Sequence, residues 1–351
     1  MKLEAPTVKT VSIVMVAHKE VSRITSRISE LTQQLDNACV EGEVIVVLDG
    51  VGGKPSELSS VVTDAVRDPR VKTFTMPCNR GKAAALTEGT QHAIGDIFVF
   101  ADVRQRWDDL ALKRLLLNFN DPFVGAVSGA LSLRSSTGDT EGVALYWKYE
   151  KWIRAQEAIY DSVVGVTGAI CAVRNELFSG VPVDTILDDV YWPLKVVMRG
   201  YRVQHDPRVV AYDQLPDHAS DEFRRKIRTL CGNFQLLQRL PAVILPWKNR
   251  IWWQFISHKI LRLIVPWALL GAVIVSATIN TSFYRWVFFG QISSYGLLLI
   301  GAYTKIAYRY RISSAATSFI MLNVAAWLAF WIWLLRYEKK IWVSIDYKDD
   351  N

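Results

Sequence analysis

Short apolar runs alternate with segments of helical periodicity in the first hundred residues of the chain. The runs are typical of buried strands, and the segments between them place apolar residues at helical spacing. The predicted strands are Val11–Ala17, Val44–Leu48, Val71–Met76 and Ile97–Ala101, and the predicted helices are Ser22–Leu35 and Lys82–Ile94. Strands that alternate with helices predict an α/β fold with a parallel, doubly wound sheet.

Polar residues follow each predicted strand at the point where it ends. They are His18-Lys19-Glu20, Asp49-Gly50, Asn79-Arg80-Gly81-Lys82 and Asp102. Because ligands of open α/β sheets bind outside the carboxyl ends of the strands, we expect these side chains to meet in one crevice. The crevice would be rich in carboxylates and would contain a Gly-Lys turn.

The residues at the start of the second predicted helix have two interpretations. Asn79 can be an ordinary helix cap, and Asp49-Gly50 can be an ordinary turn. A glycine and a lysine at a helix N-terminus also suit a phosphate, because free N–H groups and the helix dipole favour an anion. The chain contains neither a GxxxxGK[ST] loop nor a GxGxxG loop. A bound nucleotide would therefore be held by other means.

A second group of candidate residues lies between Gly165 and Gly200. The stretch GVTGAICAVR, which starts at Gly165, indicates a glycine turn followed by a short apolar strand. Asp188 and Asp189 then open a predicted helix that ends at Gly200. These two carboxylates either stabilise the helix dipole, by about 0.3–1 kcal/mol each, or take part in catalysis.

Three long segments without charge lie near the end of the chain, at Leu263–Tyr284, Trp286–Thr304 and Ile312–Leu335. A helix of about 20 apolar residues crosses the roughly 30 Å hydrocarbon core of a bilayer, so we expect about three transmembrane helices. Buried helices of a large soluble domain are the alternative. The basic loop at 305–311 and the tail sequence RYEKK both favour the cytosolic side. Either one segment is re-entrant or interfacial, or the charge rule is violated locally.

Basic residues alternate with tryptophans just before these segments, in a chain of net charge +7. Such a pattern can bind nucleic acid, but next to membrane spans it favours interfacial helices on anionic lipid. We therefore predict a lipid bilayer and no nucleic acid as a partner. The N-terminal apolar run is too short for a signal peptide, so the preceding domain should be cytosolic. Four scattered cysteines without a CxxC pair indicate reduced, buried thiols.

Taken together, these motifs resemble the family 2 glycosyltransferases, whose catalytic domain has the GT-A fold. The resemblance covers about Val11 to Leu237, and the apolar segments that follow resemble those of the polysaccharide-synthase branch. The matching residues, in order, are Ala17-His18-Lys19-Glu20, Asp49, Asn79-x-Gly81-Lys82, Asp102, Gly165-x-x-Gly168 and Asp188-Asp189. The resemblance implies an inverting enzyme that transfers sugar from a nucleotide sugar, here expected to be a UDP-sugar.

The resemblance also implies roles for the matching residues. Asp189, next to Asp188, would be the general base, a role that contributes about 10²–10⁴ in rate. Asp102 would hold Mg²⁺ or Mn²⁺ together with the donor diphosphate. The donor would contact Ala17, His18, Glu20, Asp49, Asn79, Gly81, Lys82, Asp102, Arg225 and Arg228. The acceptor would contact Trp147, Gly165, Thr167 and Gly168.

Two positions depart from the family pattern. Arg104 stands where a second carboxylate would follow Asp102. Arg225-Lys-Ile-Arg228-Thr229 replaces the Q-x-x-R-W of processive members, so that Arg228 keeps the cation but Thr229 removes the Trp of the acceptor platform. The acceptor is therefore either a growing polysaccharide or lipid-linked glycan, or a polyprenyl phosphate or glycolipid that receives a single sugar. A non-catalytic membrane partner with the same fold is a third alternative.

These observations predict an enzyme of the inner or plasma membrane with its parts in sequential order. The catalytic domain would span residues 1–222, interfacial helices 223–258 and transmembrane helices 259–340. Residues 341–351 form a tail whose last residues, DYKDDN, resemble part of a common epitope tag. The aromatic stretch Tyr146–Trp152 is either an amphipathic helix with buried rings or a surface that stacks on acceptor sugars.

Overall fold

The computed structural model describes residues 6–18, 21–50, 68–134, 141–214, 219–304 and 311–337. The chain divides into two compact units, and each is described by itself. The sheet unit comprises Met1–Ser135, Arg154–Leu215 and Leu245–Ile251, and the helical unit comprises Ser136–Ile153, Pro216–Ile244 and Trp252–Asn351. The units interleave along the chain, whereas the domains predicted from the sequence follow one another, and those domain boundaries stay predictions.

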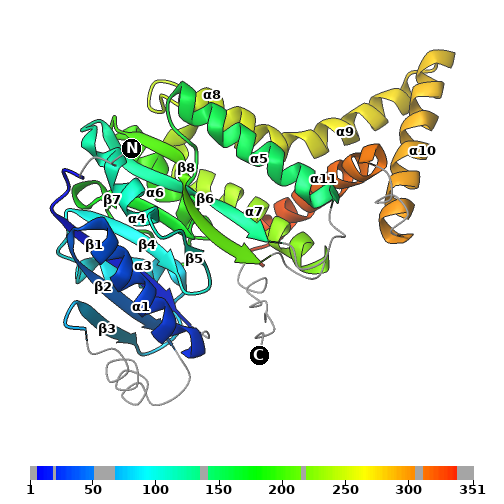
Figure 1. Ribbon diagram of the computed structural model, residues 1–351. Helices are drawn as coiled ribbons and strands as arrows, with labels where there is room; N and C mark the ends of the chain where they lie inside the picture. Colours follow the sequence, from blue (N-terminus) through cyan, green and yellow to red (C-terminus); the bar gives the residue numbers. More distant parts are fainter. Residues whose placement is uncertain are drawn as a thin grey trace. The chain divides into compact units, whose positions relative to one another are not determined.

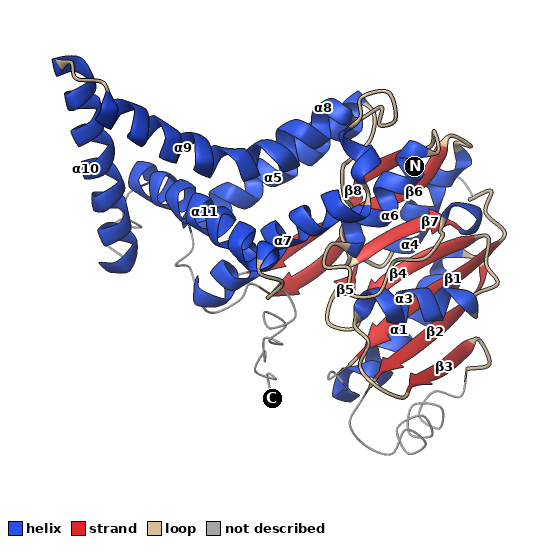
Figure 2. Cartoon of the chain, turned by 180° about the vertical axis from the view of Figure 1, so that it is seen from behind, coloured by secondary structure: helices blue, strands red, loops and turns tan. Residues whose placement is uncertain are grey.

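An eight-stranded sheet in the order β3-β2-β1-β4-β7-β6-β8-β5 forms the centre of the sheet unit (Figures 1 and 2). The strands are β1 (Thr10–Ala17), β2 (Glu41–Asp49), β3 (Val71–Met76), β4 (Ile97–Asp102), β5 (Arg106–Trp107), β6 (Val124–Arg134), β7 (Ile170–Arg174) and β8 (Arg202–Gln214). The pairs β1–β2, β1–β4, β2–β3 and β6–β8 are parallel. The pairs β4–β7, β6–β7 and β5–β8 are antiparallel. The sheet is therefore rich in parallel pairs, as predicted, but it is mixed because β7 runs against both of its neighbours.

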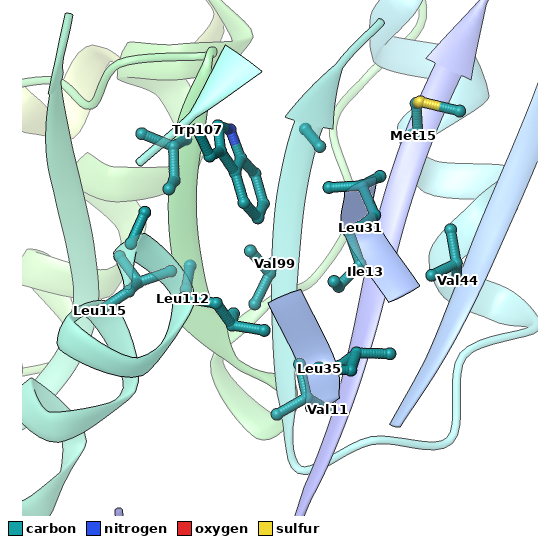
Figure 3. Packing of buried hydrophobic residues seen from close by; sticks show 14 of the residues in the cluster. Val11, Ile13, Met15, Leu31, Leu35, Val44, Val99, Trp107, Leu112 and Leu115 are labelled. Atoms are coloured by element: carbon teal, nitrogen blue, oxygen red, sulfur yellow. The ribbon is translucent and has the colours of Figure 1, made fainter. Parts of the chain in front are cut away.

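Helix α1 (Val21–Ala38) packs an apolar stripe against the first strands of the sheet. Its buried residues recur three or four positions apart, at Ile24, Ile28, Leu31 and Leu35. Alternate residues of β1 belong to the same cluster, namely Val11, Ile13 and Met15. Figure 3 shows Leu31 and Leu35 packed among them, with Trp107 and Leu112 in the same layer. Truncation of a buried leucine to alanine costs about 2–5 kcal/mol, so this layer holds the strands firmly in register.

Of the remaining helices of the sheet unit, α3 (Lys82–Gln91) and α6 (Asp188–Met198) were predicted from the sequence and α4 (Ala111–Leu117) was not. This unit also has 3-10 turns at Asn118–Asn120 and Asn175–Leu177. The helices predicted to begin at Ser22, Lys82 and Asp188 are confirmed to within one residue at their starts. Each of the four predicted strands is also confirmed, and three of them extend beyond the predicted bounds.

The helical unit contains the helices of the C-terminal part of the chain (Figure 2). They are α7 (Ala219–Arg239), a 3-10 turn at Pro241–Ile244, α8 (Trp252–Phe255), a π-helical turn at Ile256–Ile260, α9 (Leu261–Thr278), α10 (Ser282–Thr304) and α11 (Arg311–Leu334). Helix α5 (Glu141–Tyr160) belongs to this unit up to Ile153. Aromatic rings join its elements: Phe234 of α7 stacks on Trp333 of α11 at 5.4 Å between centroids, and Trp267 of α9 meets Phe330 at 5.0 Å.

Two described helices of this unit are long and apolar enough to cross a membrane, Trp252–Thr278 and Ala316–Leu334. The predicted segment Trp286–Thr304 forms part of a helix, α10, but this helix is not one of those two. A membrane domain is thus consistent with the fold, and a third span is not established.

Two smaller expectations from the sequence are corrected. Cys171 and Cys231 are buried as predicted, but Cys39 and Cys78 are exposed, and none of the four forms a disulfide. In the aromatic stretch of α5, Tyr149 and Trp152 are 55% and 59% exposed and stack on each other at 6.4 Å between centroids. The interpretation of this stretch as an amphipathic helix with buried rings is therefore wrong for these two residues.

Candidate active site

Strand register brings the predicted site residues to one edge of the sheet. Asp102 is the last residue of β4 and lies opposite Val16 in β1, next to Ala17. Asp49 ends β2, which runs parallel to β1 with Ala17 opposite Leu48. Parallel strands of similar length end at the same edge. The convergence predicted from the sequence is therefore present in the fold.

Asp49 builds the turn that precedes α3. Its carboxylate is 2% exposed and accepts the backbone N–H groups of Arg80 and Gly81, each at 2.8 Å. Gly50 has φ +59°, and a side chain there would lie 2.0 Å from the backbone nitrogen of Asn79. The Asp-Gly pair thus lets the 79–82 turn approach β2. The role visible here is to hold the 79–82 turn against the end of β2, and the predicted contact of Asp49 with a nucleoside stays a prediction.

His18 ties the end of β1 to the same turn. Its Nδ1 lies 2.6 Å from the carbonyl oxygen of Asp49, and its Nε2 lies 3.0 Å from the amide nitrogen of Asn79. Because a carbonyl oxygen only accepts, Nδ1 donates to Asp49 and Nε2 accepts from Asn79. Asn79 in turn accepts from the N–H of Gly81 at 3.0 Å. The rim that the sequence predicted for the donor is therefore a connected hydrogen-bond network.

Lys82 and Asp102 form the centre of the crevice. The Lys82 Nζ lies 2.6 Å from Asp102 Oδ1, and about one third of each side chain is exposed. Gly168 faces this pair: a Cβ at that position would lie 3.1 Å from Lys82 Nζ and 4.0 Å from Asp102 Oδ2. Glycine therefore leaves open the space in front of the ion pair, where a ligand has access to both charges.

The acidic pair lies in the first turn of α6, as predicted. The glycine turn is attached to it, because the N–H of Val166 donates to the carbonyl oxygen of Asp189 at 2.8 Å. A side chain at Gly165 would lie 2.9 Å from Val190 and 3.2 Å from that carbonyl. The turn and the helix start therefore form one rigid wall of the crevice, and Gly165 permits their close approach.

The charged side chains around Lys82 shift the pKa values of Lys82 and Asp188. Burial lowers the pKa of Lys82, but the carboxylates of Asp102, Asp188 and Asp189 outweigh burial and raise it above the ordinary value. Burial raises the pKa of Asp188 to about 6, against the opposing effect of Lys82 and with help from Asp189 and Asp102. Such displaced values are typical of functional sites. One lysine thus balances three carboxylates, and Asp188 resists ionisation.

Comparison with known proteins supports the resemblance over nearly half of the chain. Residues 12–181 match the family model described as glycosyl transferase family 2. The chain carries a family 2 glycosyltransferase domain. This match confirms the resemblance drawn from the motifs, and it covers every predicted site residue between Ala17 and Gly168.

Curated relatives of this glycosyltransferase are polysaccharide synthases. The chain is 23% identical over 246 residues to a poly-beta-1,6-N-acetyl-D-glucosamine synthase of Staphylococcus epidermidis, covering 68% of this chain and 58% of the relative. The synthase of that name from Staphylococcus aureus strain COL is 24% identical over 204 residues, covering 56% of this chain and 48% of the relative. The chain thus spans about half the length of these relatives.

A solved structure confirms the fold. A mannosyltransferase from Pyrobaculum calidifontis, in complex with GDP-Man and Mn²⁺, superposes with a TM-score of 0.69 at 22% identity. The match covers 95% of this chain and 89% of that protein. The glycosyltransferase therefore shares the fold of that enzyme.

Arg104 stands where the family pattern has a second carboxylate, and its side chain is held by an ion pair. Arg104 of the glycosyltransferase pairs with Asp213 at the end of β8, at 2.6 Å, and Gln105 donates to the same oxygen at 2.9 Å. The Asp213 side chain is only 6% exposed. Arg104 therefore links β8 to the end of β4. The side chain of Arg104 thus pairs with an acidic neighbour.

Several predicted site residues are not brought to the crevice by the described part of the structure. Glu20 lies outside the described residues, as does the side chain of Trp147. Arg225 and Arg228 lie on α7 in the helical unit, so their contacts with a donor stay predictions. Thr167 lies in the glycine turn, where its hydroxyl accepts from Arg154 at 2.9 Å and its N–H donates to Ser128. Sequence reasoning missed Arg154 and Ser128, which belong to no motif.

Within the described residues, no group of three or more His, Cys, Asp and Glu side chains is arranged to hold a metal ion by itself. The expectation from the sequence was a single protein carboxylate, Asp102, with the donor supplying further oxygens. The Asp102 carboxylate is accessible, and carboxylate oxygens are ligands that Mg²⁺ and Mn²⁺ prefer. The residues present therefore fit a site completed by a diphosphate.

Proposed function

We propose that this protein is a membrane-bound, inverting glycosyltransferase that takes sugar from a nucleoside diphosphate sugar. The acceptor is a growing polysaccharide or a lipid-linked glycan. The observation that carries the proposal is the meeting of Lys82, Asp102 and the Asp188–Asp189 pair around the open space in front of Gly168. A cation for a leaving diphosphate and carboxylates for an acceptor hydroxyl are the two requirements of glycosyl transfer by direct displacement.

The donor would bind along the 79–82 turn. Lys82 starts α3, and the first turn of a helix offers N–H groups and a positive dipole end to a phosphate. The Lys82 ammonium would exchange part of its pairing with Asp102 for the diphosphate oxygens. Charge developing on the leaving diphosphate would thus meet a fixed cation, which is the usual way in which such sites lower the barrier.

A divalent ion fits beside Asp102, whose carboxylate would hold it together with the donor. Such an ion neutralises charge on the diphosphate when it is bound. The solved mannosyltransferase was obtained with Mn²⁺, which supports either Mn²⁺ or Mg²⁺ as the ion here. Arg104 does not compete for this place, since it is paired with Asp213.

Asp189 would act as the general base. It would remove the proton of the acceptor hydroxyl while the hydroxyl oxygen forms a bond to the anomeric carbon, and the bond from that carbon to the diphosphate would break with its electron pair. Attack from the side opposite the leaving group inverts the configuration. Asp188 would stay close as a second carboxylate that keeps Lys82 oriented.

The acceptor has two candidates, as the sequence already indicated. The polysaccharide synthases among the relatives favour a growing polymer, built from N-acetylglucosamine in their case. The alternative is transfer of one sugar to a polyprenyl phosphate or glycolipid. It is favoured by Thr229, which stands in place of the platform tryptophan and whose hydroxyl bonds within α7 to the Arg225 carbonyl at 2.9 Å.

The deciding experiment incubates the detergent-solubilised full chain with a panel of nucleotide sugars that includes UDP-N-acetylglucosamine and GDP-mannose. Mg²⁺, Mn²⁺ or a chelator is present in separate reactions, with membrane lipid extract as the acceptor source. Released nucleotide identifies the donor, and product size separates polymer from single transfer. Release of nucleotide with none of the donors, although the protein binds nucleoside diphosphates, would refute the proposal in favour of a non-catalytic binding partner.

A further inference from the structure

Arg27 is a buried cation that lies directly behind the active site. Its side chain on α1 is 0% exposed. Its Nε donates to the backbone carbonyl oxygen of Asp102 at 3.2 Å, and its Nη1 bonds Glu30 at 2.5 Å. The bond to Asp102 involves the peptide of the same residue whose carboxylate pairs with Lys82. Arg27 therefore reaches the donor side of the site through the backbone.

Trp107 extends the same contacts to the acceptor side. The Arg27 guanidinium lies 4.7 Å from the centre of the Trp107 ring. The indole N–H of Trp107 donates to the carbonyl oxygen of Ala169 at 2.9 Å, and its backbone N–H donates to Glu30 at 2.7 Å. Ala169 follows Gly168, the residue that faces Lys82 and Asp102. A chain of buried contacts thus runs from Asp102 through Arg27 and Trp107 to the glycine turn.

A purely structural role does not require this arrangement. A buried ion pair loses solvation that its attraction only partly returns, and apolar residues of similar volume usually stabilise a core as well or better. Within the described residues, the Arg27 Nη2 is buried without a hydrogen-bond partner, so the position is not optimised for stability alone. What a planar guanidinium offers here is a directed N–H toward one carbonyl and a flat face for one ring.

We propose that Arg27 and Trp107 are positioning residues that fix the distance between the donor group at Asp102 and the glycine turn on the acceptor side. The proposal rests on the function proposed above. In-line displacement requires donor and acceptor groups held to within a fraction of an ångström, and a displacement of about 1 Å costs about a hundredfold in rate. Neither residue touches the substrate, so both act through the backbone of the residues that do.

The test uses one conservative variant at each position and a matched control for each. Arg27→Lys keeps the charge but loses the flat face and the Nε donor. Its control is Arg174→Lys: Arg174 also donates to backbone carbonyls and stacks on Phe119 at 5.4 Å, but it ends β7 at the opposite edge of the sheet. Trp107→Phe keeps the ring but loses the indole donor. Its control is Trp252→Phe, which removes a comparable indole bond, to Ile244, in the helical unit.

Four readouts are taken on the detergent-solubilised full chain. They are thermal unfolding, amide hydrogen exchange of the peptides 98–104 and 165–171 without ligand, binding of the nucleoside diphosphate with Mn²⁺, and steady-state kinetics of sugar transfer. We expect Arg27→Lys and Trp107→Phe to speed exchange in 165–171 and to lower kcat by about ten- to hundredfold. The affinity for the nucleoside diphosphate with Mn²⁺ should change by less than about threefold for Trp107→Phe. It should change by more for Arg27→Lys, because Arg27 and not Trp107 contacts Asp102. Both controls should lower the unfolding temperature without these changes.

Four outcomes separate the alternatives. The kcat losses of Arg27→Lys and Trp107→Phe are compared with those of controls that have the same unfolding temperature. Equal losses would overturn the proposal, because the loss of packing alone would then explain them. Unchanged exchange in 165–171 for Trp107→Phe would overturn it as well. If the wild type transfers no sugar, the function proposed above fails, whereas faster exchange in both peptides would still support coupling of the two sides. A double variant whose loss is clearly smaller than the product of the single losses supports one coupled unit.

Discussion

Single residues at the crevice have separable roles, and the acidic pair is the clearest case. Asp188 and Asp189 are neighbours in one helix turn, both influence Lys82, and burial raises the pKa of Asp188 to about 6. A general base must be ionised to accept a proton, whereas a carboxylate that resists ionisation suits a supporting role. The raised pKa therefore assigns the supporting role to Asp188 and leaves the role of base to Asp189.

Asp189→Asn should abolish sugar transfer while leaving nucleotide affinity within about twofold, because the amide cannot take a proton but keeps the shape of the side chain. Asp188→Asn is the matched control and should retain part of the turnover. Transfer is measured as product formed from a labelled nucleotide sugar, and affinity by calorimetry with nucleoside diphosphate and Mn²⁺. Undiminished turnover by the purified Asp189→Asn protein would exclude this residue as the base.

The raised pKa of Asp188 also makes a prediction about stability. Burial raises it from 3.8 to about 6 in the folded protein, so the folded state holds this proton more tightly than the unfolded state does. The carboxyl therefore contributes stability below about pH 4, and that contribution is lost as the pH rises through 6. At pH 8 Asp188→Asn should unfold at a higher temperature, equivalent to about 1–3 kcal/mol, and the gain should shrink at pH 5.

Thermal unfolding of both proteins at the two pH values checks this, with the exposed Asp109→Asn as control. A gain of equal size at pH 5 and pH 8 would show that lost charge at Asp188 is not its cause.

Gly168 is the residue whose replacement most directly tests the open space of the crevice. A methyl group there would lie 3.1 Å from Lys82 Nζ, tighter than ordinary van der Waals contact, in the place where a ligand would approach the ion pair. Gly168→Ala should therefore lower donor affinity at least tenfold, equivalent to about 1.4 kcal/mol, with little change in unfolding temperature. Gly200→Ala, away from the crevice, should instead affect folding through its φ of +93°. Titration with nucleoside diphosphate measures the effect, and equal affinity for wild type and Gly168→Ala would mean that the donor does not occupy this space.

At the scale of secondary structure, the sequence predicts the elements that build the donor side and misses much of the acceptor side. Strands β1, β2 and β4 are continuous apolar runs because both of their faces are covered, and such runs are easily read. Strands β6 and β8 were missed. They mix polar and apolar residues, and their pairing contains shifts of register between Val124 and Ala126 and between Ser128 and Ala130. A period that changes within a strand hides it from pattern reasoning.

Sequence patterns likewise reveal only part of the candidate active site. Residues in motifs, such as Asp49, Lys82 and Asp102, were found because they end strands or start a helix. Arg27 and Trp107 were not found, since their importance comes from contacts across 80 positions of sequence that only the fold reveals. The role of Asp49 was also out of reach, because a carboxylate that binds two turn N–H groups has the same sequence signature as one that binds a nucleoside.

The ion pair between Arg104, which follows β4, and Asp213 of β8 gives a prediction about how these strands are held together. Restoring the family pattern with Arg104→Asp would not simply create a second metal ligand, because Asp213 would lose its cation while nearly buried. Removal of one partner from a buried ion pair costs about 3–5 kcal/mol. We therefore expect Arg104→Asp to lower the unfolding temperature sharply, and the double variant Arg104→Asp/Asp213→Arg to recover part of it. Thermal unfolding of the three proteins decides this, and a single variant as stable as the wild type would show that the pair does not hold β8.

At the scale of the whole molecule, the question is how the helical unit meets the membrane. Two described helices have the length and apolar character of spans, and only 17% and 28% of their apolar windows are buried, which leaves many side chains at least partly accessible to lipid. Helix α10 carries exposed Phe283, Trp286 and Phe289 together with Arg285 and Gln291. Aromatic rings beside a cation are typical of the interface between lipid and water. Two crossings with an interfacial α10 would return the chain to the cytosolic side and satisfy the charge rule at the RYEKK tail, but they would leave the basic loop 305–311 on the outer side, against that rule.

Cysteine labelling in intact cells tests this topology. In a chain whose four native cysteines are replaced by serine, single cysteines are introduced at Asn118 in the sheet unit, at Thr281 between α9 and α10, and at Tyr337 after α11. If two helices cross and α10 lies in the interface, a membrane-impermeant maleimide should label only Thr281→Cys before lysis and all three variants after lysis. Labelling of Tyr337→Cys in intact cells would instead require three crossings with the tail outside. Recovery of the protein in the soluble fraction, without detergent, would refute a membrane-spanning helical unit altogether.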